Sequence, residues 1–213
     1  MATEAAVDQN GRVLGPKALA TRERLLDETQ ALLENGSLRE LRVVEIARKA
    51  GTSPATFYQY FKDVEDAVLC LAEQAGEDVP AVVEMIGGPW SGVAGLANAR
   101  AVVDAFIRHW DENRAVLRVR NLASEEGDLR FQRVRRRTLS PVIEAFAEQF
   151  EGGLRAGTIS SQIHPYAGAA ALAAILERMA AYHVELEGFG MTRQDLVESC
   201  ARILAQTLVG SAD

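Results

Sequence analysis

One stretch of the sequence, residues 41–74, constrains the fold more than any other, because it predicts two helices joined by a tight turn. Its centre, residues 47–61, reads A-R-K-A-G-T-S-P-A-T-F-Y-Q-Y-F. Gly51 is expected to end the first helix, since glycine readily adopts the left-handed backbone found at helix C-termini. Ser53 can cap the second helix, and Pro54 fits its first position, where a missing N–H costs nothing.

The second helix of this pair has two different faces. At about 100° per residue, Phe57 and Phe61 fall together on a face that must be buried. The remaining positions are small, hydroxylated, amide-bearing or basic: Ala55, Thr56, Tyr58, Gln59, Tyr60 and Lys62. Such side chains suit a DNA groove, because Lys, Thr and Tyr can donate to phosphates and Gln can pair with adenine. A short amphipathic helix pair inside an all-α core fits the pattern equally well.

A resemblance to a known family separates these interpretations. The segments 21–27 (T-R-E-R-L-L-D), 45–47 (E-I-A), 50–53 (A-G-T-S) and 56–61 (T-F-Y-Q-Y-F) resemble the DNA-binding domain of the TetR family of bacterial transcriptional regulators. The resemblance covers residues 18–74, about a quarter of the chain. It implies an N-terminal three-helix domain with a helix-turn-helix that binds double-stranded operator DNA. The DNA contacts expected from it are Arg22, Arg42, Ser53, Ala55, Thr56, Tyr58, Gln59, Tyr60 and Lys62.

Two positions depart from the pattern of the family. Many members have a basic residue where this chain has Val44, and a lysine where it has Val64. Those basic residues usually grip phosphates, and Arg42 and Lys62, each two positions earlier, are the expected substitutes. Without these substitutes the number of phosphate contacts would be low and the affinity for DNA modest.

The distribution of charge is typical of a protein that contacts DNA with one end only. The chain of 213 residues has a net charge of −7, which argues against indiscriminate nucleic-acid binding. Residues 11–62 contain nine Lys/Arg and six Asp/Glu, so this segment is +3 and the remainder is −10. A basic head on an acidic body is expected to approach DNA through the head.

No segment predicts export or membrane insertion. No apolar run approaches the ~18 residues of a membrane span, and the N-terminus lacks the basic start and apolar core of a signal peptide. We therefore expect a cytoplasmic protein without a membrane partner. Cys70 and Cys200 lie far apart in the sequence, so neither a disulfide framework nor a zinc site is indicated.

Helical periodicity continues to the end of the chain, so we expect an all-α fold of about nine helices. The resemblance divides the chain into a flexible arm (1–17), a helix-turn-helix domain (18–63) and a helical ligand-binding and dimerisation domain (64–213). After the helix that opens at Val64, the main helices expected are 93–113, 115–125, 128–150, 165–187 and 193–209.

The last two helices are expected to form a dimer interface. Residues 166–182 are apolar almost all round, which predicts a helix covered on every side. In the family, the last two helices form a four-helix bundle with their copies in a second subunit. A homodimer also supplies the two recognition helices that a two-fold operator requires. Core helices of a monomer are the alternative.

The resemblance also implies a small-molecule effector inside the body. The large apolar side chains expected to line its pocket are Phe106, Trp110, Phe146, Phe150, Met179 and Tyr182. Each is more often part of an ordinary helical core than of a pocket. The implied function is that of a ligand-responsive homodimeric repressor, released from its operator by an apolar or amphipathic molecule.

Two other functions are compatible with the sequence. The arginine-rich segment 130–137 can be a solvated face or can dock an anionic ligand or a partner protein, which would make the body an interaction module. A DNA contact by this segment is disfavoured, because it lies far along the chain from the head. A helical carrier or enzyme with a vestigial head is the other possibility. We expect no enzyme activity, no cofactor and no metal, because no P-loop, dinucleotide fingerprint, nucleophile elbow or metal-type histidine spacing is present.

Overall fold

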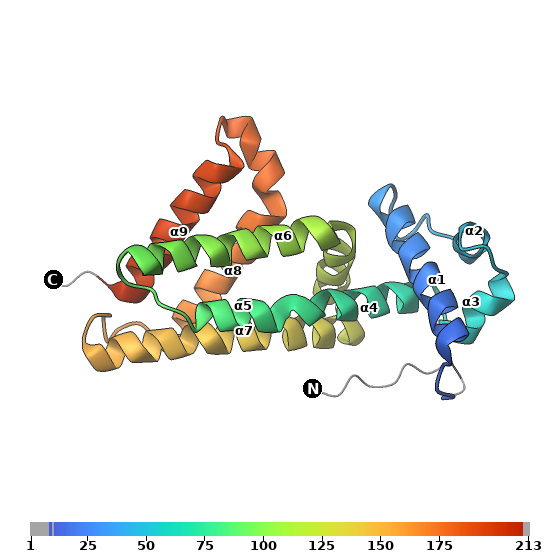
Figure 1. Ribbon diagram of the computed structural model, residues 1–213, viewed down its shortest axis with the longest axis horizontal. Coiled ribbons are helices and arrows are strands. Elements are labelled where there is room, and N and C mark those ends of the chain that lie inside the picture. Colours follow the sequence, from blue (N-terminus) through green and yellow to red (C-terminus); the bar gives the residue numbers. More distant parts are fainter. Residues whose placement is uncertain (1–8, 10, 211–213) are drawn as a thin grey trace. The chain divides into compact units, whose positions relative to one another are not determined.

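The protein is helical throughout the part described by its computed structural model, which comprises residue 9 and residues 11–210. Those residues form nine α-helices and no β-strand, which confirms the predicted fold class (Figure 1). Most of the predicted flexible arm, residues 1–8 and 10, lies outside the described residues. The helices are α1 (Pro16–Glu34), α2 (Val43–Lys49), α3 (Pro54–Tyr60), α4 (Val64–Gln74), α5 (Val79–Ile86), α6 (Gly92–Glu125), α7 (Leu129–Ala156), α8 (Pro165–Leu186) and α9 (Arg193–Val209).

The described residues form two compact units. The head unit comprises the described part of Met1–Ala75 together with Arg114–Arg135, and the body unit comprises Gly76–Asn113 and the chain from Arg136 onward. The chain therefore passes between the units three times, once after α4 and once each within α6 and α7. The predicted division of functional domains after residue 63 stays a prediction.

The helix signals in the head occur where the sequence predicts them. Gly51 has a φ of 66° and follows α2. The Ser53 hydroxyl accepts the backbone N–H of Thr56 at 3.2 Å, and the Asp63 carboxylate accepts that of Asp66 at 2.8 Å. These two caps fix where α3 and α4 begin, and therefore the direction in which α3 presents its side chains.

The core of the head unit combines segments that are distant in sequence. Phe57 and Phe61 are fully buried, with ring centroids 5.3 Å apart, as the spacing in α3 predicts. Val116 of α6 and Phe131 and Val134 of α7 belong to the same buried cluster. The second part of α6 and the start of α7 thus complete the core that supports the helix-turn-helix.

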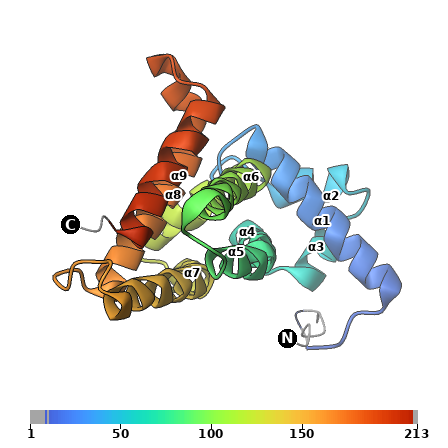
Figure 2. The same cartoon turned by 60° about the vertical axis from the view of Figure 1, so that its left-hand side comes forward.

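The body unit contains α5, the first part of α6, most of α7, and the α8–α9 pair. The sequence predicts two helices, 93–113 and 115–125, and α6 is interrupted at Asn113, whose backbone is not helical (φ −124°, ψ 15°). A Cβ atom at Gly168 of α8 would lie 2.7 Å from Cζ of Phe150 in α7, so glycine is needed for this close approach. Figure 2 shows α8 and α9 side by side, and the two helices are in contact.

Candidate nucleic-acid interface

Helix α3 presents the polar surface that the sequence predicts. Its two buried phenylalanines hold one face inside the head unit, so the other face points to solvent. Tyr58 is 54% exposed, and Ala55, Gln59 and Lys62 are also exposed, as is Ser53 at the cap. The remaining two candidates of this helix, Thr56 and Tyr60, are half-buried at the edges of the face. The face is therefore accessible to a DNA groove, while its role in binding stays a prediction.

The C-terminal end of α3 is held by a residue from far away in the sequence. The backbone N–H of Gln9 donates to the Gln59 carbonyl at 3.0 Å, and its side-chain amide donates to the Tyr60 carbonyl at 3.1 Å. The same amide donates to Asp66 at 3.4 Å, and Asp66 also accepts the backbone N–H of Lys62 at 3.0 Å. Because the last carbonyls of a helix have no partner within it, Gln9 stabilises the end of the helix that would read DNA.

The two arginines expected to contact phosphates already have partners. The Arg22 side chain is 17% exposed, lies with its guanidinium 5.4 Å from the ring centroid of Phe61, and pairs with Glu23 at 3.0 Å. Arg42 is exposed, and its guanidinium donates to the carbonyls of Arg39 and Leu41 at 2.7 and 3.1 Å. A phosphate contact from Arg22 would compete with Glu23, whereas Arg42 has room for one.

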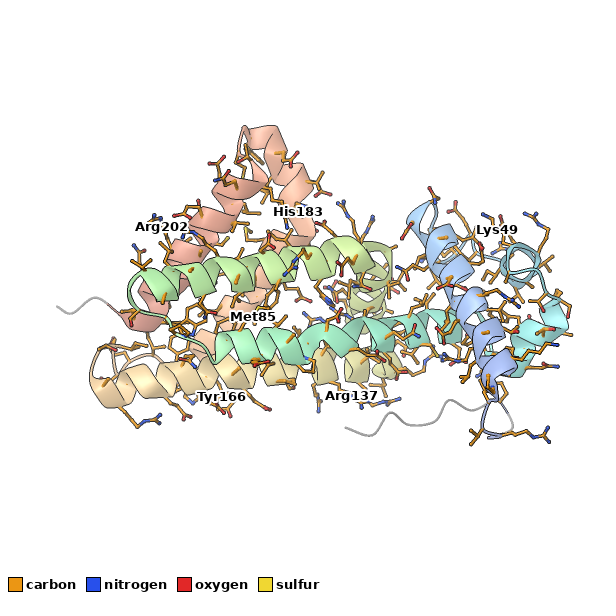
Figure 3. All side chains as sticks on the ribbon, in the orientation of Figure 1. Lys49, Met85, Arg137, Tyr166, His183 and Arg202 are labelled. Carbon is orange, nitrogen blue, oxygen red and sulfur yellow. The ribbon has the colours of Figure 1, made fainter. Side chains whose placement is uncertain are left out.

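The end of α2 provides basic side chains that the sequence analysis did not single out as contacts. Arg48 and Lys49 occupy the last turn of α2, and both are exposed. Lys49 is labelled in Figure 3. Val44, at the position where family members are often basic, is 66% exposed. The surface of α2 therefore has positive charge at its C-terminal end and an apolar residue near its start. Their exposure and charge are the signals that mark Arg48 and Lys49 as candidates.

Arg130 of the arginine-rich segment lies beside α4, although it is distant from it in sequence. Its guanidinium pairs with Asp128 at 2.8 Å and with Glu65, in the first turn of α4, at 3.8 Å. The hydrogen bonds from Arg130 lower the pKa of Asp128 to about 2. The pairing of Arg130 with Asp128 is compatible with the solvated-face interpretation. Although the arginine-rich segment lies far along the chain from α3, residues 130–135 belong to the head unit.

The six residues expected to line an effector pocket all lie in the body unit, but they differ in burial. Phe146, Phe150 and Trp110 are 0, 1 and 5% exposed, and the ring centroids of Phe146 and Trp90 are 6.0 Å apart. Phe106 and Met179 are half-buried. Tyr182 is 45% exposed, with the Arg178 guanidinium 4.9 Å from its ring centroid. The buried aromatic residues are thus better placed for an internal ligand than Tyr182.

Several large apolar side chains are exposed on the last part of the chain. On α8, α9 and the turn between them they are Tyr166, Ile175, Tyr182, Val184, Phe189 and Ile203. None of the described helices is long and apolar enough to cross a membrane.

Solved structures share this fold at low sequence identity. FadR from Bacillus halodurans, a fatty acid degradation regulator, is 18% identical, with 94% of this chain and 98% of that chain covered and a TM-score of 0.64. FadR from Bacillus subtilis, solved in complex with stearoyl-CoA, is 17% identical over 88% and 97%, with a TM-score of 0.60. SmeT, solved in complex with triclosan, is 17% identical over 86% and 90%, with a TM-score of 0.63. SmeT is the repressor of a multidrug efflux pump in Stenotrophomonas maltophilia.

Family models match both parts of the sequence. Residues 25–66 match the model for bacterial regulatory proteins of the tetR family. Residues 83–211, more than half of the chain, match the model for the tetracyclin repressor-like C-terminal domain. No curated protein sequence matches the chain. On the strength of these two matches, the chain belongs to the TetR family of bacterial regulatory proteins.

Proposed function

We propose that this protein is a homodimeric transcriptional repressor, acting in the cytoplasm, that binds a two-fold operator and leaves it when a small molecule occupies the body unit. The observation that supports this best is the exposed polar face of α3, which is pinned by the buried Phe57 and Phe61. In this proposal Gln59 reads a base, and the hydroxyl and basic groups around it anchor phosphates. The phosphate-anchoring groups are Thr56, Tyr58, Tyr60 and Lys62, and the other contacts proposed are Ser53, Ala55, Arg22 and Arg42.

The exposed apolar side chains of α8 and α9 support dimerisation. Val184 is 46% exposed and Phe189 is 83% exposed. Contact of such apolar side chains with water is unfavourable in free energy, and the cost increases with the exposed apolar area. Burying them against a second copy would also supply the second recognition helix. Two such helices must lie about 34–36 Å apart to enter successive major grooves.

The three chain crossings between the units support a ligand response. Solved relatives bind stearoyl-CoA and triclosan, which favours an apolar or amphipathic effector here. Two of the crossings lie at irregular backbone, a 3-10 turn at Ala75–Asp78 and the interruption at Asn113. We infer that a ligand in the body unit changes these segments and thereby the separation of the two α3 helices, which lowers the affinity for the operator.

The test is footprinting of the purified protein on its own upstream intergenic region at two salt concentrations. We expect a salt-sensitive protected site, and Gln59→Ala to weaken its binding about tenfold or more, since a bidentate base contact is worth ~1–3 kcal/mol. Gln162→Ala, which changes an exposed glutamine of the body unit, is the matched control and should bind normally. Equal binding by the Gln59→Ala variant and the wild type would refute the proposed role of α3.

A further inference from the structure

Two tryptophans are buried in the body unit, and they differ in their hydrogen bonding. Trp90 is 7% exposed, and its indole N–H donates to the Ile86 carbonyl at 2.8 Å. Trp110 is 5% exposed, and its indole N–H has no acceptor among the described residues. It is the one buried side-chain nitrogen or oxygen of those residues that lacks a partner. Since buried indole N–H groups usually find an acceptor, this donor needs an explanation.

The Trp110 side chain lies on the buried face of α6. It follows Val103 and Ile107 at helical spacing, and each of these is 1% exposed. The body unit also buries the aromatic rings of Phe146 and Phe150. An apolar interior with a few polar groups is the usual composition of a small-molecule site, in which such groups orient the ligand.

The charged residues of the body unit restrict the charge of any ligand atom that accepts a hydrogen bond from Trp110. Among the described residues of this unit, no lysine or arginine is buried. The buried histidine of the unit, His183, is already engaged, with Nδ1 2.9 Å from the Ala180 carbonyl and Nε2 3.2 Å from Asp111 (Figure 3). An ionised carboxylate beside Trp110 would therefore lack a buried cationic partner, which makes its desolvation costly. A neutral oxygen carries no such penalty.

We propose that the indole N–H of Trp110 is the polar anchor of the effector site, and that it donates to a neutral oxygen of an otherwise apolar ligand. The ligand class is a carbonyl compound, namely a ketone, ester, thioester or amide, and a free carboxylate is excluded from this position. The inference rests on the proposed function for its biological role. Binding at Trp110 can nevertheless be measured without DNA.

The experiment follows the two indole N–H resonances of the ¹⁵N-labelled full-length protein by NMR, with Trp90→Phe and Trp110→Phe variants to assign them. Three ring compounds of similar size serve as probes: cyclohexanone, cyclohexanecarboxylate at neutral pH, and methylcyclohexane. We expect the Trp110 proton of the free protein to lie upfield of the Trp90 proton, because it lacks a hydrogen bond. Cyclohexanone should move it downfield in a saturable manner, whereas the other two probes should not, and the Trp90 proton should stay in place.

The Trp110→Phe variant isolates the hydrogen bond from the apolar contacts. We expect it to bind cyclohexanone roughly three- to tenfold more weakly, which is the usual net effect of one hydrogen bond. Its affinity for methylcyclohexane should equal that of the wild type. If the two probes lose affinity equally, the indole provides packing only and the proposed anchor is wrong.

Two other results would overturn the inference. A Trp110 proton that already resonates beside that of Trp90 and does not respond to cyclohexanone would mean that water satisfies the indole. An equal downfield shift with cyclohexanecarboxylate would remove the restriction to neutral acceptors. If cyclohexanone moves the Trp110 proton but operator binding is absent or unaffected, the site stands and the proposed ligand-released repressor fails.

Discussion

The head unit and the body unit differ in how complete they are as isolated structures. In the head unit, caps from Ser53 and Asp63 and a closed aromatic core define one polar surface. In the body unit, apolar side chains such as Phe189 remain exposed and Trp110 keeps an unsatisfied donor. The polar surface of the head is thus fixed by contacts within its own unit, whereas the body keeps apolar and polar groups that the proposed dimer and ligand would cover.

The largest expected effect tests whether α7 belongs to the head. Phe131→Ala should lower the free energy of unfolding by ~3–5 kcal/mol, because it opens a cavity in the buried cluster to which Phe57 and Phe61 also belong. Urea unfolding measures this, and DNA binding should be lost with it. Leu129→Ala, at a position 65% exposed, is the control and should change stability by less than ~0.5 kcal/mol. If both changes have equally small effects on the free energy of unfolding, the start of α7 does not contribute to the core of the head unit.

The second prediction tests whether the body is incomplete without a partner. Val184→Glu places a charge at an exposed apolar position of α8 and should weaken dimerisation at least about tenfold, since a charge in the proposed interface would be desolvated on association. Sedimentation velocity measures the oligomeric state. Val44→Glu changes a comparably exposed valine of the head and should leave that state unchanged. If the wild-type protein is a monomer, the exposed apolar side chains of the body unit do not form a dimer interface.

The third prediction concerns the hydrogen bonds that hold the end of α3. Gln9→Ala removes the side-chain contacts to Tyr60 and Asp66, at 3.1 and 3.4 Å, while keeping the backbone one. We expect operator affinity to fall roughly threefold to tenfold, as for loss of one net hydrogen bond. Fluorescence anisotropy on the footprinted site measures this. Gln74→Ala, which removes a 3.2 Å contact to Glu23 within the same unit, should leave affinity nearly unchanged. If Gln9→Ala and Gln74→Ala lower the operator affinity equally, the effect of Gln9 does not come from its contacts with the end of α3.

The smallest expected effect concerns the ion pair between Asp128 and Arg130. Because the pKa of Asp128 is lowered to about 2 in the folded protein, the pair stabilises the head fully above the ordinary aspartate pKa of ~3.9. That contribution decreases as the pH falls below ~4 and is lost as it passes through about 2. Asp128→Asn should therefore cost about 0.5–1 kcal/mol at pH 7 and less at pH 3. A pH-independent difference in urea unfolding would contradict this.

Features governed by neighbouring residues were predictable from the sequence. The caps at Ser53 and Asp63, the left-handed Gly51 and the burial of Phe57 and Phe61 all follow from local backbone preferences and helical spacing. The interruption near Asn113 was expected for the same reason. Local rules also identified the exposed face of α3, and the resemblance assigned it a role that binding experiments must test.

Features that join distant segments were not predictable. Nothing near Gln9 indicates a contact with Tyr60, which is 51 residues away. The helical spacing around Phe131 predicts that it is buried, but it does not show whether Phe131 is buried in the head unit or in the body unit. A single sequence likewise does not reveal that Trp110 lacks an acceptor while Trp90 has one, because the two differ only in their three-dimensional surroundings.

The shared core of the head has a consequence for protein engineering. A chimeric regulator could be attempted by cutting the chain once and joining its N-terminal portion to another body. Here a cut after Ala75 would leave behind Val116, Phe131 and Val134, which belong to the same buried cluster as Phe57 and Phe61. A transplanted head would need substitutes for them from its new host. The interchangeable part is therefore a discontinuous one: exchanging the body unit means replacing Gly76–Asn113 and the chain from Arg136 onward, while Arg114–Arg135 stays with the head.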